Sequence, residues 1–142
     1  MVVVQEAEGG LVTNIDVVEA HDAALLVPAV ERHIAVFGRP PTMAATDRGF
    51  FSRVGEERIA ELGVRRPVIP HSGYRSKARI THERQRWFRR GRAWRAGGEA
   101  RIGRLKHTFG MARSRYRGSG GIPRTTYWVA IANNFVAVTV FA

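Results

Sequence analysis

The sequence predicts an α/β domain built on a mixed sheet. Two short apolar segments flank a glycine turn near the start, which is the pattern of an antiparallel hairpin. Two later apolar runs are separated by a helical pattern, and a helical crossover favours parallel pairing of the strands it joins. The length of 142 residues suits one domain, and a hydrophobic fraction of 44% is enough to form a core.

The first elements follow from alternation and from helix end signals. We expect strands over residues 2–5 and 11–18, joined by a turn through Gly9 and Gly10, so that residues 2–18 form a hairpin. A helix is expected over residues 22–37, with Asp22 as its N-cap, Pro28 near its permissive first turns and Gly38 as its stop.

The later elements have weaker signals. Residues 42–46 and 64–69 read as strands, and Ser52 is placed to cap a helix that reaches Leu62. Residues 71–84 predict an exposed loop, followed by one long helix from near Gln85 or Arg92 to Phe109. Residues 124–142 predict a last, mostly apolar helix.

Composition excludes several classes of protein. The chain has no cysteine, which rules out a disulfide framework, a zinc–thiolate site and a cysteine nucleophile. The most apolar stretch, residues 127–142, contains Asn133 and Asn134 and is shorter than the roughly 20 residues of a bilayer span. No secretory signal pattern is visible, so a cytoplasmic protein without a membrane partner is expected. The five histidines lack metal-ligand spacing, and no Ser-His-Asp arrangement is supported.

Positive charge is concentrated in one segment. The formal net charge is +11, and arginine supplies 21 of the 23 cations. Residues 75–117 contain 15 bases and two acids, whereas residues 1–47 have a net charge of −5. Because arginine binds phosphate bidentately, this segment predicts contact with a nucleic acid. The alternatives are a solubilising face, or RNA binding without chemistry.

Two carboxylates have positions that suggest chemistry. Asp47 follows the strand at residues 42–46, at the strand end where catalytic side chains of parallel sheets gather. Glu99 is one of the two acids in the basic segment. On a helical wheel Arg95, Glu99 and Lys106 lie within about 40° of one another, beside an apolar stripe. The simpler interpretation is an i, i+4 ion pair between Arg95 and Glu99, worth only a few tenths of a kcal/mol.

These residues also form a recognisable pattern. Three residues separate Arg95 from Glu99, and six separate Glu99 from Lys106. This pattern resembles the signature around the last acid of DDE-type transposases of bacterial insertion sequences. Asp47-Arg48-Gly49-Phe50 is similar to the motif around the second acid of that family. The likeness extends from about Val3 to Asn134.

The resemblance implies an RNase H-like fold and DNA transposition. In that family three carboxylates hold two divalent ions, normally Mg²⁺ (or Mn²⁺), for DNA strand cleavage and transfer. By position, Asp47 and Glu99 would be catalytic metal ligands, and Arg95 and Lys106 would contact DNA. The expected partners are transposon ends and target DNA, bound by a homodimer at the nucleoid. Further DNA contacts are expected from the basic segment, at Arg92, Arg101, Arg115 and Arg117.

The sequence departs from the family pattern in two ways. Arg92 stands where the family often has tyrosine, with Trp94 as the nearby aromatic surface. The family's first aspartate and its central strand have no counterpart, and neither Asp16 nor Asp22 matches them. We therefore expect an N-terminally truncated catalytic domain with little activity alone. Two other functions stay open: a small basic nucleic-acid-binding protein without catalysis, and an RNase H-like nuclease.

Overall fold

The computed structural model describes residues 2–19, 21–118 and 120–141, and the chain divides into two compact units. The hairpin unit combines Met1–Glu19 with Gly98–Ala142, and the central unit is Ala20–Gly97. The elements of the hairpin unit are β1 (Val2–Glu6), the 3-10 turn η1 (Glu8–Gly10), β2 (Val12–Val17), α5 (Gly98–His107) and α6 (Gly121–Phe141). Those of the central unit are α1 (Asp22–Phe37), β3 (Met43–Ala45), η2 (Arg48–Phe50), α2 (Arg53–Glu61), β4 (Arg66–Val68), α3 (Lys77–Arg84) and α4 (Arg86–Ala96).

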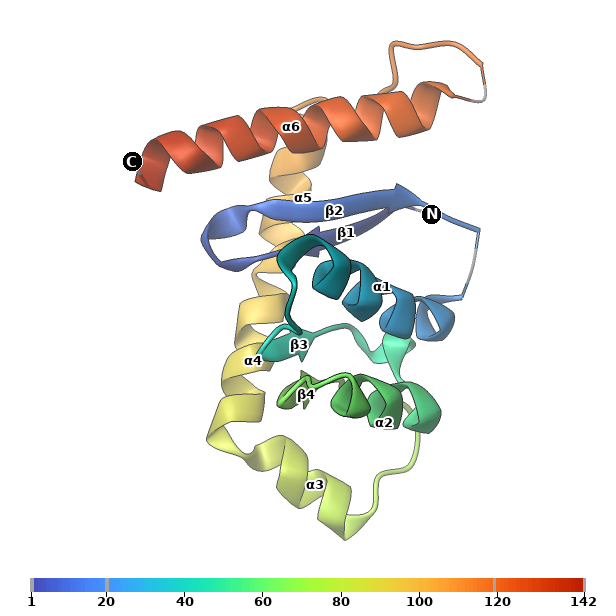
Figure 1. Ribbon diagram of the computed structural model, residues 1–142, viewed down its shortest axis with the longest axis vertical. Coiled ribbons are helices and arrows are strands. Elements are labelled where there is room, and N and C mark those ends of the chain that lie inside the picture. Colours follow the sequence, from blue (N-terminus) through green and yellow to red (C-terminus); the bar gives the residue numbers. More distant parts are fainter. Residues whose placement is uncertain (1, 20, 119, 142) are drawn as a thin grey trace. The chain divides into compact units, whose positions relative to one another are not determined.

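The predicted hairpin is confirmed. β1 and β2 pair antiparallel, with Val2 opposite Val17 and an irregularity between Gln5 and Glu6. The turn uses the freedom of glycine, since Gly9 and Gly10 both have positive φ, at 86° and 76°. Figure 1 shows the two strands side by side, with α6 lying along the hairpin. Helices α5 and α6 supply the rest of this core, which contains Val12, Ile15, Leu105, Val129 and Ala130.

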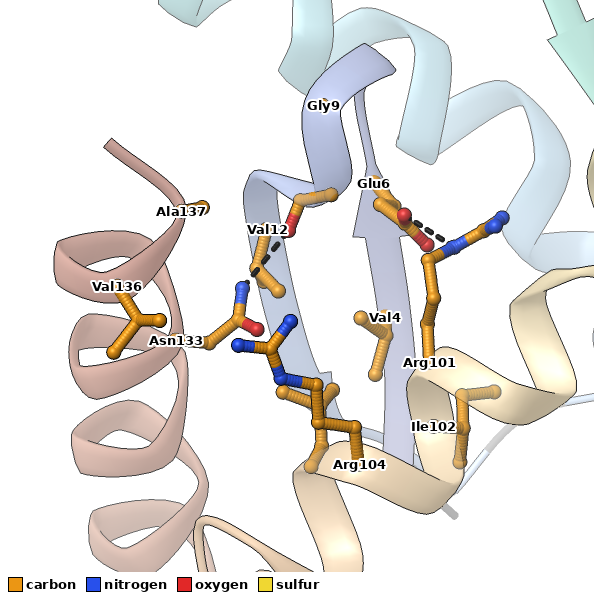
Figure 2. Close-up of a pocket in the computed structure, with 12 residues that line it drawn as sticks. Val4, Glu6, Gly9, Val12, Arg101, Ile102, Arg104, Asn133, Val136 and Ala137 are labelled. Atoms are coloured by element: carbon orange, nitrogen blue, oxygen red, sulfur yellow. Dashed lines mark hydrogen bonds and ion pairs between the residues drawn. The ribbon is translucent and has the colours of Figure 1, made fainter. Parts of the chain in front are cut away.

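Two asparagines explain how the apolar helix α6 binds the hairpin. The Asn134 side chain accepts the backbone N–H of Val12 and donates to the carbonyl of the same residue, both at 2.8 Å. Asn133 donates to the carbonyl of Gly10 at 2.9 Å. Figure 2 shows the Asn133 side chain pointing from α6 toward the hairpin. These amides satisfy backbone groups at the start of β2 that would otherwise be buried without partners. Polar residues therefore interrupt this apolar segment because they attach the helix to the hairpin.

The central unit contains the predicted parallel pair. Met43 of β3 lies opposite Arg66 of β4, and Ala45 lies opposite Val68. Helix α2 connects the strands, and its cap is the predicted one, because the Ser52 hydroxyl accepts the N–H of Gly55 at 3.0 Å. The core of this unit is formed by Leu26, Val30, Ile59, Val64 and Ile69.

The α/β class is thus confirmed, but the sheet is divided. In the described residues each strand has one hydrogen-bonded neighbour, giving the pair β1–β2 and the pair β3–β4. The two pairs do not form the single mixed sheet that was predicted, because no described strand bridges them.

Several helix boundaries were predicted wrongly. The N-cap of α1 is His21, and Asp22 is the first helical residue. Pro28 lies inside α1. It comes after the first turn, where a backbone N–H has no partner within the helix and proline is tolerated because it lacks that group. Residues 77–84 form helix α3 rather than a loop, with the Ser76 hydroxyl accepting the N–H of Arg79 at 3.2 Å. The predicted last helix begins at Gly121, earlier than residue 124, and Ala142 lies outside the described residues.

The long helix predicted up to Phe109 is in fact two helices. Helix α4 ends at Ala96 with Gly97 as its C-cap, and α5 begins at Gly98. Glycine is the poorest helix former after proline, so this pair is a natural point for one helix to end and the next to begin.

A buried ionic network holds α3 in place. The Arg79 guanidinium binds both carboxylate oxygens of Glu56, at 2.9 and 2.7 Å, and also binds Glu83 at 3.0 Å. Glu83 is 5% exposed and accepts two further bonds, from the backbone N–H of His71 and from Arg75. The network joins α3 to α2 and to the segment after β4. This long-range pairing explains why a segment of low hydrophobicity forms a helix.

The network predicts acid sensitivity through Glu83. Burial opposes ionisation, but the His71 N–H and the guanidinium groups of Arg79 and Arg75 outweigh it and lower the pKa of Glu83. The pKa of this carboxyl is about 4.3 in the unfolded chain and lower in the folded protein. Its contribution to the free energy of unfolding is therefore fully present above about pH 4.3, and it is lost as the pH falls through the pKa of the folded protein. Glu83→Gln should therefore cost about 2–4 kcal/mol at pH 7 and progressively less below about pH 4. Urea unfolding across this pH range measures the difference.

The matched control is Glu57→Gln. Glu57 is paired with Arg53 on the surface with 61% of its side chain exposed, so its loss should change stability by less than about 0.5 kcal/mol. An equal loss for Glu83→Gln at all pH values would contradict the ionic account.

A candidate nucleic-acid site around Asp47 and helix α4

Asp47 lies where the parallel pair ends. The N–H of Thr46 still bonds to the carbonyl of Val68 at 3.1 Å, which extends the ladder one residue beyond β3. Asp47 comes next and starts η2, its carbonyl accepting the N–H of Phe50 at 3.2 Å. Its side chain is 58% exposed. The carboxylate is therefore accessible at the carboxyl end of the strand, as the sequence predicted.

Arg95 binds this carboxylate. The guanidinium of Arg95, near the end of α4, forms an ion pair and hydrogen bond with Asp47 Oδ2. Arg95 was expected to lie beside Glu99 or to contact DNA, but its described partner comes from a segment 48 positions earlier. The pair brings the Asp47 motif into contact with the arginine that begins the Glu99 motif.

A glycine positions Arg95 by letting α4 approach the strands closely. A Cβ added at Gly91 would lie 2.6 Å from Val68 Cγ2 and 3.0 Å from Met43 Sδ. Both of these residues belong to the parallel pair, and Phe88, one turn earlier on α4, is fully buried. Only a residue without a side chain fits at this contact. Arg95 follows Gly91 by four residues on the same side of the helix.

The other side of α4 forms an exposed basic surface. Four of its arginines are exposed, and we call them the arginine face: Arg86, Arg89, Arg90 and Arg92. Trp87 and Trp94 lie along one edge of this face and are half-buried. Guanidinium groups beside aromatic rings are typical of nucleic-acid-binding surfaces.

Asp22 also lies at this site, which the sequence did not indicate. A Cβ at Gly49 would come within 2.6 Å of Asp22 Oδ2, so the start of α1 places this carboxylate against η2. The glycine two residues after Asp47 was the available signal, since it marks a close approach. The sequence predicts Asp22 as the N-cap of α1, whereas the N-cap is His21.

The remaining predicted site residues belong to the hairpin unit. Glu99 is exposed in the first turn of α5, and Lys106 is exposed in its last turn. Arg115 and Arg117 are exposed between α5 and α6. Arg101 instead forms an ion pair with Glu6 of β1, beside a cavity of about 190 Å³ (Figure 2). Arg101 therefore has a structural partner that competes with the predicted DNA contact.

The structure thus brings some predicted site residues together. Asp47 and Arg95 meet within the central unit, whereas Glu99 lies in the hairpin unit, so convergence of Asp47 and Glu99 stays a prediction. Over residues 2–19, 21–118 and 120–141 no three His, Asp or Glu side chains are grouped to hold a metal ion. Within the same residues, none of the helices has the length and apolar character needed to cross a membrane.

Comparisons with protein-family models, with curated proteins and with solved structures found no match for this chain.

The close packing at Gly91 predicts a measurable asymmetry between two glycines. Gly91→Ala should lower the free energy of unfolding by about 1–3 kcal/mol, because the methyl group overpacks against Val68 and outweighs its helix propensity. Gly103→Ala in α5 has nothing within 4 Å of its new Cβ and should stabilise the protein by about 0.5–1 kcal/mol. Chemical denaturation measures both variants. Equal stabilisation by the two substitutions would contradict the close approach of α4.

Proposed function

We propose that this chain is part of a DDE transposase catalytic domain that cleaves and joins DNA strands. The observation that carries the proposal is the ion pair between Asp47 and Arg95. The sequence suggested two separate motifs, one around each residue, and such motifs can occur together by chance. Their physical contact supports the view that they belong to one site.

The proposed chemistry depends on carboxylates. Asp47 and Glu99 are both exposed and carry oxygen ligands of the kind that Mg²⁺ or Mn²⁺ prefers. When bound, such ions activate the attacking hydroxyl and stabilise the leaving oxygen at a DNA phosphate. The family uses three carboxylates, of which this chain matches two. Arg95 neutralises Asp47 in the free protein and lies where it could pair with a phosphate instead.

The arginine face would bind the DNA backbone. Its four guanidinium groups are exposed on a helix whose opposite side packs against the parallel pair, so their position is set by a rigid element. Rigid presentation of arginines reduces the entropy lost when they bind phosphates. We assign the nucleic-acid contact to this surface first, and to Lys106, Arg115 and Arg117 second.

The order of the elements supports an RNase H-like fold as part of this proposal. An antiparallel hairpin is followed by a helix, and then by a parallel pair with a helical connection.

A second function, nucleic-acid binding without catalysis, is favoured by a specific observation. The Asp47 carboxylate already has an ion-pair partner, and the described residues contain no three-residue metal group. On this alternative Asp47 only anchors α4. An RNase H-like nuclease is the third candidate, distinguished by hydrolysis in place of strand joining.

DNA binding should depend on the arginine face and on salt. Arg89→Ala and Arg92→Ala should each lower affinity for a short duplex and reduce the salt slope by about 1, since each loses about one phosphate contact. Arg53→Ala is the control, because Arg53 is 86% exposed on α2 and paired with Glu57. Fluorescence anisotropy between low and physiological salt measures these slopes. Affinity that does not change with salt would exclude this surface as a phosphate-binding site.

Strand transfer by this 142-residue chain alone should be weak. Only two of the family's three carboxylates have a counterpart, so at least one ion should bind poorly. An in vitro joining assay with Mg²⁺ or Mn²⁺, using Glu99→Gln as the control, measures the activity. Robust joining that Glu99→Gln abolishes would contradict the expected weakness, and Asp22 would then be the first candidate for the third ligand.

A further inference from the structure

The hairpin unit contains a cavity that the proposed function does not use. Its volume is about 190 Å³, and it is lined by residues of β1, η1, β2, α5 and α6. All of these elements belong to the hairpin unit, so one compact body sets the walls. Neither Asp47 nor Glu99 is among the lining residues. The carboxylates proposed to bind metal therefore take no part in this cavity.

The turn of the hairpin explains why this space is not filled. Gly9 and Gly10 line the cavity and have the positive φ angles that the turn requires. A Cβ added at Gly10 would meet a single atom of the described residues within 4 Å, Glu6 Oε1 at 3.9 Å. The glycines that form the turn thus present no side chain to α5 and α6, and space remains beside them.

Most of the wall is apolar. Val4 and Val12 come from the hairpin, Ile102 and Leu105 from α5, and Ala137 from α6. Figure 2 shows Val4 and Val12 on the hairpin, with α6 on one side and α5 on the other. A dry apolar cavity of about 150 Å³ is large enough to bind benzene. This cavity therefore has room for a six-membered ring with a small substituent.

Three charged side chains line the cavity and leave it with a net positive charge. Glu6 and Arg101 form an ion pair and neutralise each other. Arg104 is exposed, lies 5.5 Å from the ring centre of Phe109, and takes part in none of the ion pairs among the described residues. Figure 2 shows its side chain extending from α5 in the direction of Asn133. Two arginines against one glutamate give a charge of +1, so an anion is complementary to this cavity.

We propose that this cavity binds a small monocarboxylate with an apolar body, such as benzoate. The apolar body contacts Val4, Ile102 and Leu105, and the carboxylate pairs with the guanidinium of Arg104. The planar N–H groups of arginine match the two oxygens of a carboxylate. Binding requires neither DNA nor metal, so the test of this site is independent of the proposed function.

Size and chemistry argue against other classes of ligand. Inorganic phosphate also pairs with arginine, but it leaves the apolar walls without a contact. A neutral aromatic compound fills the apolar part but brings no charge to Arg104. A nucleotide is much larger than a cavity that is only slightly above the size needed for benzene.

A chemical-shift titration of the full chain with sodium benzoate tests the site. The amide signals of Gly9, Gly10 and Ile102 should shift and saturate with a Kd on the order of 1 mM, as expected for so small a ligand. Benzamide, the neutral analogue, should bind about 3- to 10-fold more weakly, because it lacks the charge that pairs with Arg104. Inorganic phosphate should not saturate these signals at the same concentrations.

Two substitutions separate the charged part of the site from the apolar part. Arg104→Gln should weaken benzoate binding about 3- to 10-fold and leave benzamide binding within about 2-fold. Arg113→Gln is the matched control, because Arg113 is exposed outside the cavity, and it should change neither. Val4→Phe should abolish binding of both compounds by filling the cavity, whereas Val17→Phe, outside the cavity on β2, should not. The amide spectrum of each variant shows whether it folds, and the Arg104→Gln result decides the proposal even if Val4→Phe does not.

Three results would overturn the proposal. Shifts spread over exposed arginines, without saturation at Gly9 and Gly10, would show surface ion pairing only. Equal binding of benzoate and benzamide would remove the role of Arg104, and equal losses from Arg104→Gln and Arg113→Gln would show that the charge acts without a specific site.

Discussion

The close approach of α4 to the parallel pair is the constraint on which the candidate site depends. Gly91 permits it, because any side chain there would overlap Val68 and Met43. The close approach sets the distance between α4 and the strands, and it places Arg95 within reach of Asp47. It also directs the arginine face away from the strands. One missing side chain thus determines both the ion pair and the basic surface.

Arginine has two distinct roles in this chain. Arg79 is 15% exposed and holds α3 through Glu56 and Glu83, so its charge is balanced within the fold. Burial opposes the charged form of Arg79, but the bonds to both carboxylates outweigh it and raise its pKa. The arginine face has no such burial, and its charge is directed to solvent. The net charge therefore overstates the number of cations that are accessible to a nucleic acid.

The sequence predicted the elements with strong local signals. The glycine turn of the hairpin, the Ser52 cap and the crossover between parallel strands all depend on near neighbours, and all are confirmed. Helix α3 was missed because its stability comes from Glu56 and His71, which are distant in sequence. The sequence did not predict Asp47 as the partner of Arg95 for the same reason, because the i, i+4 rule applies only to residues within one helix. The position of Asp22 beside Gly49 could likewise be found only from the tertiary structure.

The proposed function requires that Asp47 and Glu99 bind the same metal ion when DNA is present, and a double-mutant cycle tests this requirement most directly. Mn²⁺ affinity, followed by electron paramagnetic resonance of the free ion with a short duplex present, would be measured for wild type, Asp47→Asn, Glu99→Gln and the double variant. If both carboxylates bind the same ion, each single substitution should cost nearly as much affinity as the double substitution. Additive losses, or no loss from either substitution, would contradict the claim.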